Sequence, residues 1–133
     1  MVLVDANVLL DIFTNDPLWN RWSTSKLRSV LISDNAALNP IIYAEISLAF
    51  GHSAELEDHI QSLAIRKLDL PYKAAFDAGR AFLKYRRAGG ERRSPLPDFY
   101  IGAHASVAGF TLLTRDANRY STYFPNVKLI APE

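Results

Sequence analysis

The sequence predicts an α/β fold in one domain, residues 1–133, with a central parallel sheet of four to five strands and helices on both faces. Short apolar segments alternate with longer segments of helical periodicity, which is typical of a parallel sheet. The first segment, residues 2–4, has no polar residue, as expected for a strand covered on both sides. The chain has the length of one domain, and no repeat or linker divides it.

The first part of the chain carries two clear helix-start signals. Asp16 and Pro17 form one, with Asp16 as N-cap and proline at the first helical position. Asn39 and Pro40 form the other, and Gly51 ends the helix that follows. The expected elements are strands at 2–4 and 36–38 and helices at 6–13, 17–31 and 40–50.

The second part predicts a longer helix after Pro71, which closes at Gly89 and Gly90. Its periodicity predicts an inner face of five residues, Ala75, Phe76, Gly79, Phe82 and Leu83. The other expected elements are helices at 53–64 and 98–108, strands at 65–70, 110–114 and 127–130, and a turn of helix at 118–124.

Composition excludes several classes of protein. The chain is 49% hydrophobic and 22% charged, which is ordinary for a folded protein. It has no cysteine, so disulfides, thiolate metal sites and cysteine nucleophiles are excluded. No segment is apolar for long enough to span a membrane, and no secretory signal opens the chain, so we expect a cytoplasmic location. A net charge of +1 favours no class of partner.

Four acidic residues are placed where they can converge. Asp5 follows the first strand, Asp116 follows the strand at 110–114, Asp98 begins a helix, and Glu45 lies within the helix after Pro40. Parallel strands bring such residues to the carboxyl-end crevice of the sheet. Two carboxylates about 4 Å apart repel by about 4 kcal/mol at an effective dielectric of about 20, so protons or a metal must neutralise them. Carboxylates without histidine or cysteine favour Mg²⁺ or Mn²⁺, which predicts phosphodiester hydrolysis.

Each acid also has a simpler interpretation. Asp5 and Asp98 can cap helices, Asp116 can form an Asx-turn, and Glu45 can be solvated. The apolar neighbours of Asp5 and Glu45 weigh against this interpretation for those two, because a charge in such surroundings is costly unless it is paired.

Four segments, in this order along the chain, are VDANVLLDIF, NPIIYAEIS, LPDFYIGAHASVAG and LLTRDANRY. With them the chain resembles the PIN-domain ribonucleases, most closely the VapC-type toxins of toxin–antitoxin pairs. The resemblance implies a PIN-like three-layer fold and an Mg²⁺- or Mn²⁺-dependent endoribonuclease that uses a metal-activated water. It also implies an RNA substrate (tRNA, rRNA or mRNA), a VapB-like antitoxin as inhibitor, and a homodimer.

The resemblance also assigns roles to individual residues. The implied metal-binding and catalytic acids are Asp5, Glu45, Asp98 and Asp116. Asn7 and Thr114 match the family's polar residues near the first and last acids, and they would orient the ligands.

A basic segment precedes Asp98. It contains Arg86, Arg87, Arg92 and Arg93 and could bind RNA phosphates beside the cleavage site. The alternative is a solvated helix end, where cations also suit the helix dipole. RNA or partner contact is favoured for Arg92 and Arg93 only.

The aromatic residues and histidines suggest mainly structural roles. Trp22 is expected to pack in the core, with a groove for a partner helix, formed with Trp19, as the alternative. Tyr120, Tyr123 and Phe124 are expected to cover the sheet edge. The three histidines show no ligand spacing and are assigned no catalytic role.

Two other functions fit parts of the pattern. An aspartate-nucleophile phosphatase would need a second aspartate two residues after Asp5, where this chain has Asn7. A non-catalytic metal- or RNA-binding α/β regulatory domain would hold a metal without cleaving RNA.

Overall fold

Strand β1 (Val2–Val4) is the centre of a five-stranded, fully parallel sheet with the order β3-β2-β1-β4-β5. The computed structural model describes residues 1–89 and 96–133. The predicted α/β class and strand number are confirmed. The remaining strands are β2 (Ala36–Leu38), β3 (Arg66–Lys67), β4 (Thr111–Leu113) and β5 (Leu129–Ile130), so β3 and β5 are shorter than predicted.

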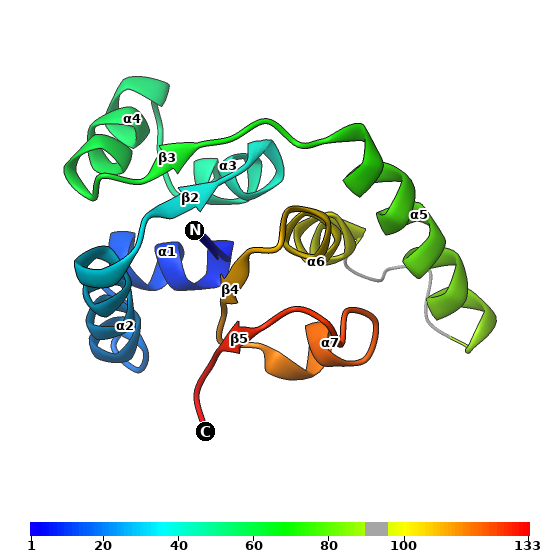
Figure 1. Cartoon of the computed structure of the whole chain (residues 1–133). Coiled ribbons are helices and arrows are strands. Elements are labelled where there is room, and N and C mark those ends of the chain that lie inside the picture. The colour runs from blue at the N-terminus through cyan, green and yellow to red at the C-terminus, as the bar shows by residue number, and fades with distance from the viewer. Residues whose placement is uncertain (90–95) are drawn as a thin grey trace.

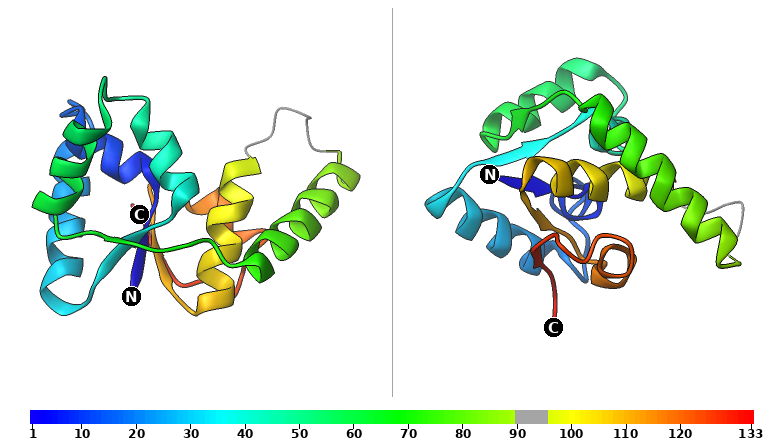
Figure 2. Two further views of the ribbon diagram at one scale, coloured as in Figure 1. Left: turned by 90° about the horizontal axis from the view of Figure 1, so that it is seen from above. Right: turned by 45° about the vertical axis from the view of Figure 1, so that its right-hand side comes forward.

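Helices cover both faces of the sheet (Figures 1 and 2). Seen from above, α1, α2 and α4 lie on one side and α5, α6 and α7 on the other, while α3 packs against α1 and α6. This arrangement agrees with the predicted three layers. The helices are α1 (Ala6–Phe13), α2 (Asn20–Ser33), α3 (Pro40–Ser47), α4 (Ser53–Ser62), α5 (Tyr72–Arg87), α6 (Leu96–Ala108) and α7 (Ala117–Ser121).

The core forms on both sides of β1. Leu3 and Val4 are completely buried, and so are Val8 and Leu9 of the helix that follows. Burying one such side chain stabilises the fold by about 1.5 to 3 kcal/mol. Asp5 directly follows Val4 and precedes Val8 by three positions, so it is held in a rigid part of the molecule.

One of the two predicted helix starts is correct. Asn39 caps α3, with its side chain accepting a hydrogen bond from the Ile42 amide at 2.9 Å. Asp16 instead caps a separate turn, accepting from the Leu18 and Trp19 amides, and α2 begins only at Asn20. The start predicted at Pro17 was three residues early because a capped turn and a capped helix have the same local sequence.

The inner face predicted for α5 was wrong in part. Ala74 and Ala78 are the buried residues, whereas Gly79 is exposed and Phe76 is 63% exposed. Small residues at this face let α5 lie close against α6. Gly89, with a φ of 92°, ends the helix region in a conformation that favours glycine, while Gly90 lies outside the described residues.

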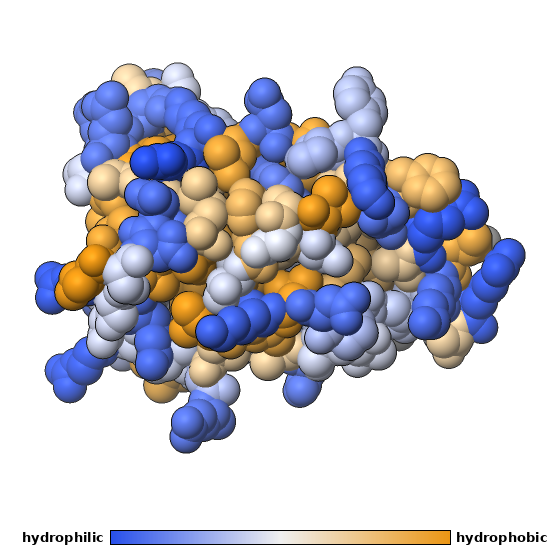
Figure 3. All heavy atoms as spheres, viewed as in Figure 1, coloured by the Kyte–Doolittle hydropathy of each residue, from blue (hydrophilic) through white to orange (hydrophobic). Residues whose placement is uncertain are grey.

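The described surface carries scattered apolar residues. Figure 3 shows hydrophobic residues interspersed with hydrophilic ones over one face. No helix among the described residues is both long and apolar enough to cross a bilayer. The large exposed hydrophobic residues are Leu18, Ile32, Leu48, Tyr72, Phe76 and Leu96.

Candidate functional site

Asp5 lies at the carboxyl end of β1, and only 4% of its surface is exposed. Its Oδ1 accepts from the Ala6 amide at 2.8 Å. Its Oδ2 accepts from the hydroxyls of Thr114 and Tyr120, each at 2.8 Å. Burial raises the pKa of Asp5 to about 6, against the opposing effect of the Thr114 and Tyr120 hydrogen bonds. The fold therefore holds this carboxylate in place at an electrostatic cost.

Asn7 and Thr114 join the first turn of α1 to the loop after β4. The Asn7 amide donates to Thr114 Oγ1 and to Asp5 Oδ2, both at 3.4 Å, and its carbonyl oxygen accepts from the Arg115 amide at 3.2 Å. Thr114 Oγ1 also accepts from the Asp116 amide at 3.0 Å. These contacts fix the backbone of the first and last acids relative to one another.

Glu45 projects from α3, and its Oε1 is buried without a hydrogen-bond partner among the described residues. Burial is the largest cause that raises its pKa to about 7, followed by the charges of Asp5 and Asp98, while Arg119 opposes the shift. A buried carboxylate oxygen without a partner calls for a proton or a cation.

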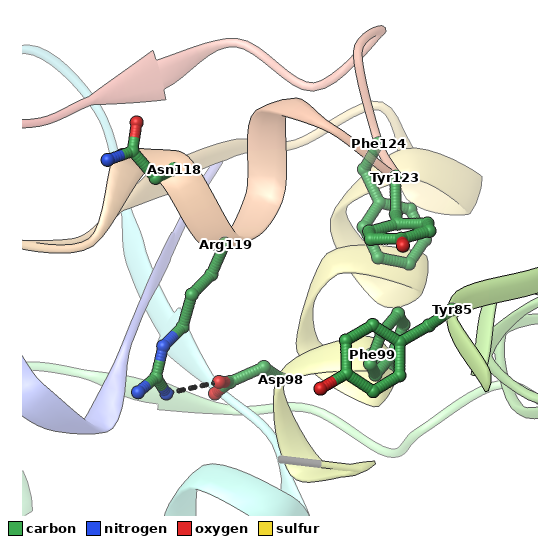
Figure 4. Close-up of a pocket in the computed structure, with 7 residues that line it drawn as sticks. All are labelled: Tyr85, Asp98, Phe99, Asn118, Arg119, Tyr123 and Phe124. Carbon is green, nitrogen blue, oxygen red and sulfur yellow. Dashed lines mark hydrogen bonds and ion pairs between the residues drawn. The ribbon is translucent and has the colours of Figure 1, made fainter. Parts of the chain in front are cut away.

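Asp98 and Asp116 share one cation. The Arg119 guanidinium contacts Asp98 Oδ2 at 2.5 Å through Nη1 and Asp116 Oδ2 at 2.7 Å through Nε (the Asp98 pair is drawn in Figure 4). The Tyr120 hydroxyl, which donates to Asp5, also lies 3.4 Å from Asp98 Oδ1. Burial raises the pKa of Asp98, and Arg119 opposes this.

Contacts through Tyr120 and Arg119 thus link three of the predicted acids, Asp5, Asp98 and Asp116, and Glu45 is coupled to them by charge alone, but the four do not form a complete metal cage. Within residues 1–89 and 96–133, no three acidic or histidine side chains are arranged as a metal site. Arg119 instead neutralises Asp98 and Asp116 by pairing with both carboxylates. The donor set and the partnerless oxygen of Glu45 nevertheless suit a hard cation.

The sequence did not identify Tyr120 and Arg119 as site residues. The expected role for Tyr120 at the sheet edge was wrong, since it is 1% exposed and lies between Asp5 and Asp98. Tyr123 and Phe124 pack against Phe99 of α6. The signal was present in the spacing, because residues three and four after Asp116 lie on the same side of a helix as Asp116.

We expect Tyr120→Phe to lower the free energy of unfolding by about 1.5 to 3 kcal/mol at pH 8 without divalent metal, because the variant loses the hydroxyl that donates to the charged Asp5 carboxylate at 2.8 Å. Urea denaturation measures this loss. Tyr72→Phe is the matched control, since Tyr72 is 94% exposed. Equal stability of the two variants would contradict a role for the Tyr120 hydroxyl in holding the acids.

A second polar network braces the site from α1. Arg115 donates to both carboxylate oxygens of the buried Asp11, at 2.8 and 3.0 Å, and the Ser23 hydroxyl donates to Asp11 at 2.6 Å. The Arg115 guanidinium lies 5.1 Å from the centre of the Trp19 ring. Since Arg115 directly precedes Asp116, this network anchors the loop that carries the last acid.

The sequence also singled out residues other than the acids. Arg86 and Arg87 are exposed in the last turn of α5, and Arg92 and Arg93 lie outside the described residues. His104 is buried, its Nδ1 3.0 Å from the Asn39 amide, and burial lowers its pKa. Trp22 packs against the core while partly exposed, in agreement with its expected structural role.

The fold and the site define an α/β protein with an acidic cluster where its central parallel strands end. Residues 2–125 match the family model described as PIN domain. The chain belongs to the PIN-domain family, which confirms the resemblance seen in the sequence. No curated protein matches the chain.

Solved structures share this fold at low sequence identity. The chain is 16% identical to a chain of VapBC2 from Rickettsia felis bound to a promoter DNA fragment, with a TM-score of 0.76 and complete coverage of both chains. The chain is 19% identical to a chain of a toxin–antitoxin complex from Klebsiella pneumoniae, with a TM-score of 0.74, and the match covers 100% of this chain and 98% of that one. The chain is 14% identical to Mycobacterium tuberculosis VapC20, described as a sarcin-ricin loop cleaving toxin. The TM-score is 0.62, and the match covers 96% of this chain and 99% of that one.

Proposed function

We propose that this protein is a VapC-like endoribonuclease that depends on Mg²⁺ or Mn²⁺ and hydrolyses RNA phosphodiester bonds. The observation that carries the proposal is the partnerless buried oxygen of Glu45 within a network that also contains Asp5 and Asp98. Membership of the PIN-domain family supports the same activity.

In this proposal Asp5, Glu45, Asp98 and Asp116 hold the divalent ion. The bound ion would supply an activated water and charge stabilisation at the phosphate. Thr114 and Tyr120 hold the Asp5 carboxylate by hydrogen bonds, so that little reorientation of Asp5 is needed. Arg119 contacts only Oδ2 of Asp98 and of Asp116, so Oδ1 of each remains for the ion.

We also propose that a VapB-like antitoxin inhibits the protein and that the protein is a homodimer in the cytoplasm. The solved structures named VapBC2 and toxin–antitoxin complex support a partner of this kind. The proposed substrate class is tRNA, rRNA or mRNA, and one relative is described as cleaving the sarcin-ricin loop.

The test is to titrate Mg²⁺ and Mn²⁺ against end-labelled RNA and, in parallel, a small phosphate monoester. We expect internal RNA cleavage that depends on the metal and stops with EDTA. Phosphate release from the monoester alone would instead identify a phosphatase. Metal or RNA binding without cleavage would identify a non-catalytic domain, and either result would overturn the proposed nuclease.

A further inference from the structure

A cavity opens beside Asp98, between α5, α6 and the segment that contains α7. Its volume is about 320 Å³, within the range of small-ligand sites. Figure 4 shows its aromatic residues on one side and the Arg119–Asp98 pair on the other. The described residues that line it are Tyr85, Asp98, Phe99, Asn118, Arg119, Tyr123 and Phe124.

Aromatic rings form most of the cavity wall. Phe99 and Phe124 are buried, whereas Tyr85 and Tyr123 are partly exposed. The Tyr85 ring lies 5.5 Å from Phe99 and 5.9 Å from Tyr123, measured between ring centres. These contacts hold the rings in fixed positions, so a flat ligand would meet a preformed aromatic surface.

The cavity is continuous with the acidic site. Asp98 and Arg119 line the cavity and also belong to the carboxylate network. A ligand that spans both would therefore need an anionic group near Arg119 and the carboxylates proposed to hold the metal, and a flat apolar group among the rings. A nucleotide within a single-stranded RNA has this combination, since each phosphate is linked to a base with two apolar faces.

We infer that this cavity binds an unpaired base next to the scissile phosphate. The inference rests on the proposed nuclease function and adds the residues that stack the base, namely Tyr85 and Tyr123. Base stacking on aromatic side chains tolerates any sequence, so this site selects single-stranded structure rather than base identity.

The test compares binding of a short fluorescein-labelled single-stranded RNA with that of an abasic RNA of the same length. Fluorescence anisotropy is measured with Ca²⁺ in place of Mg²⁺ to separate binding from cleavage. We expect the wild-type protein to bind the base-containing RNA about 5- to 150-fold more tightly than the abasic RNA. Tyr85→Leu and Tyr123→Leu should each reduce this ratio, whereas the exposed-site control Tyr72→Leu should keep it.

Equal binding of both RNAs by the wild type, or an unchanged ratio in both cavity variants, would overturn the inference. Loss of antitoxin binding in these variants without loss of RNA binding would also overturn it, because the cavity would then hold a protein side chain. If the leucine variants fail to fold, photocrosslinking of 4-thiouridine RNA to the wild type tests whether the cavity binds the base. Crosslinks at Tyr85 or Tyr123 support the inference, and crosslinks found only elsewhere reject it.

The two proposals can fail separately. Metal-dependent cleavage with equal binding of normal and abasic RNA would reject the base site and keep the nuclease. A strong preference for base-containing RNA that depends on Tyr85 and Tyr123, without cleavage in Mg²⁺, would reject the nuclease and keep the base site.

Discussion

Replacing Asp5 by asparagine is expected to reduce Mg²⁺-dependent RNA cleavage by at least about 100-fold, because the variant loses charge where the proposed metal and the developing negative charge must be stabilised. The measurement is the initial rate of cleavage of end-labelled RNA at saturating Mg²⁺. Asp58→Asn on α4 is the matched control, since Asp58 is exposed and outside the acidic network. Asp98→Asn is expected to behave like Asp5→Asn.

The same substitution should leave the fold intact. An asparagine side-chain oxygen can still accept the Ala6 amide hydrogen bond.

In the wild type without metal, the folded-state pKa of Asp5 is about 6, above its ordinary value of 3.8. The folded state therefore binds its proton more tightly, and stability should fall as the pH rises from about 4 to 7.

Asp5→Asn should weaken this pH dependence, which thermal unfolding without metal can measure. Glu45, with a pKa of about 7, still contributes to the remaining slope. Wild-type cleavage rates in a folded Asp5→Asn protein would reject the acidic site as the catalytic centre.

Arg115→Met is expected to lower the free energy of unfolding by about 3 to 5 kcal/mol, the largest stability change we predict. The substitution removes both charged hydrogen bonds to Asp11 and leaves that carboxylate buried with the Ser23 hydroxyl. Asp11→Ala should cost less, because the Arg115 side chain is already 28% exposed and its charge can turn toward water.

Urea denaturation of both single variants and of the double variant gives the interaction free energy of the Arg115–Asp11 pair, apart from the other effects of each substitution. Asp77→Ala is the control, since it breaks an exposed Lys73–Asp77 contact of 3.9 Å and should cost less than about 0.5 kcal/mol. A loss in Arg115→Met as small as in this control would show that the Asp11 network does not stabilise the loop before Asp116.

The sequence predicted the parts of the fold that depend on local signals. The apolar segment at 2–4, the Asn39–Pro40 helix start and the strand before Asp116 all agree with the structure. The buried face of α5 was misjudged because packing against α6 favours the small Ala74 and Ala78 over the larger Phe76. Local periodicity cannot predict which residue size a neighbouring helix accepts.

The sequence pointed to the four acids and, through the family resemblance, to Asn7 and Thr114, both of which donate to Asp5. It did not point to the other side chains that contact the acids. Tyr120 and Arg119 are site residues because the fold brings α7 beside Asp5 and Asp98, which depends on the sheet order and not on a local motif. The cavity beside Asp98 likewise requires α5, α6 and α7 together.

The hydrogen bonds of Asp5 also determine when the site can exist during translation. The partners Thr114 and Tyr120 lie 109 and 115 residues after Asp5 in the chain. At about 5 to 20 residues per second, a ribosome adds Tyr120 roughly 6 to 23 s after Asp5. Until both have been added, the nascent polypeptide lacks at least one of the two hydroxyl donors to Asp5, so the early carboxylates cannot yet be organised for chemistry.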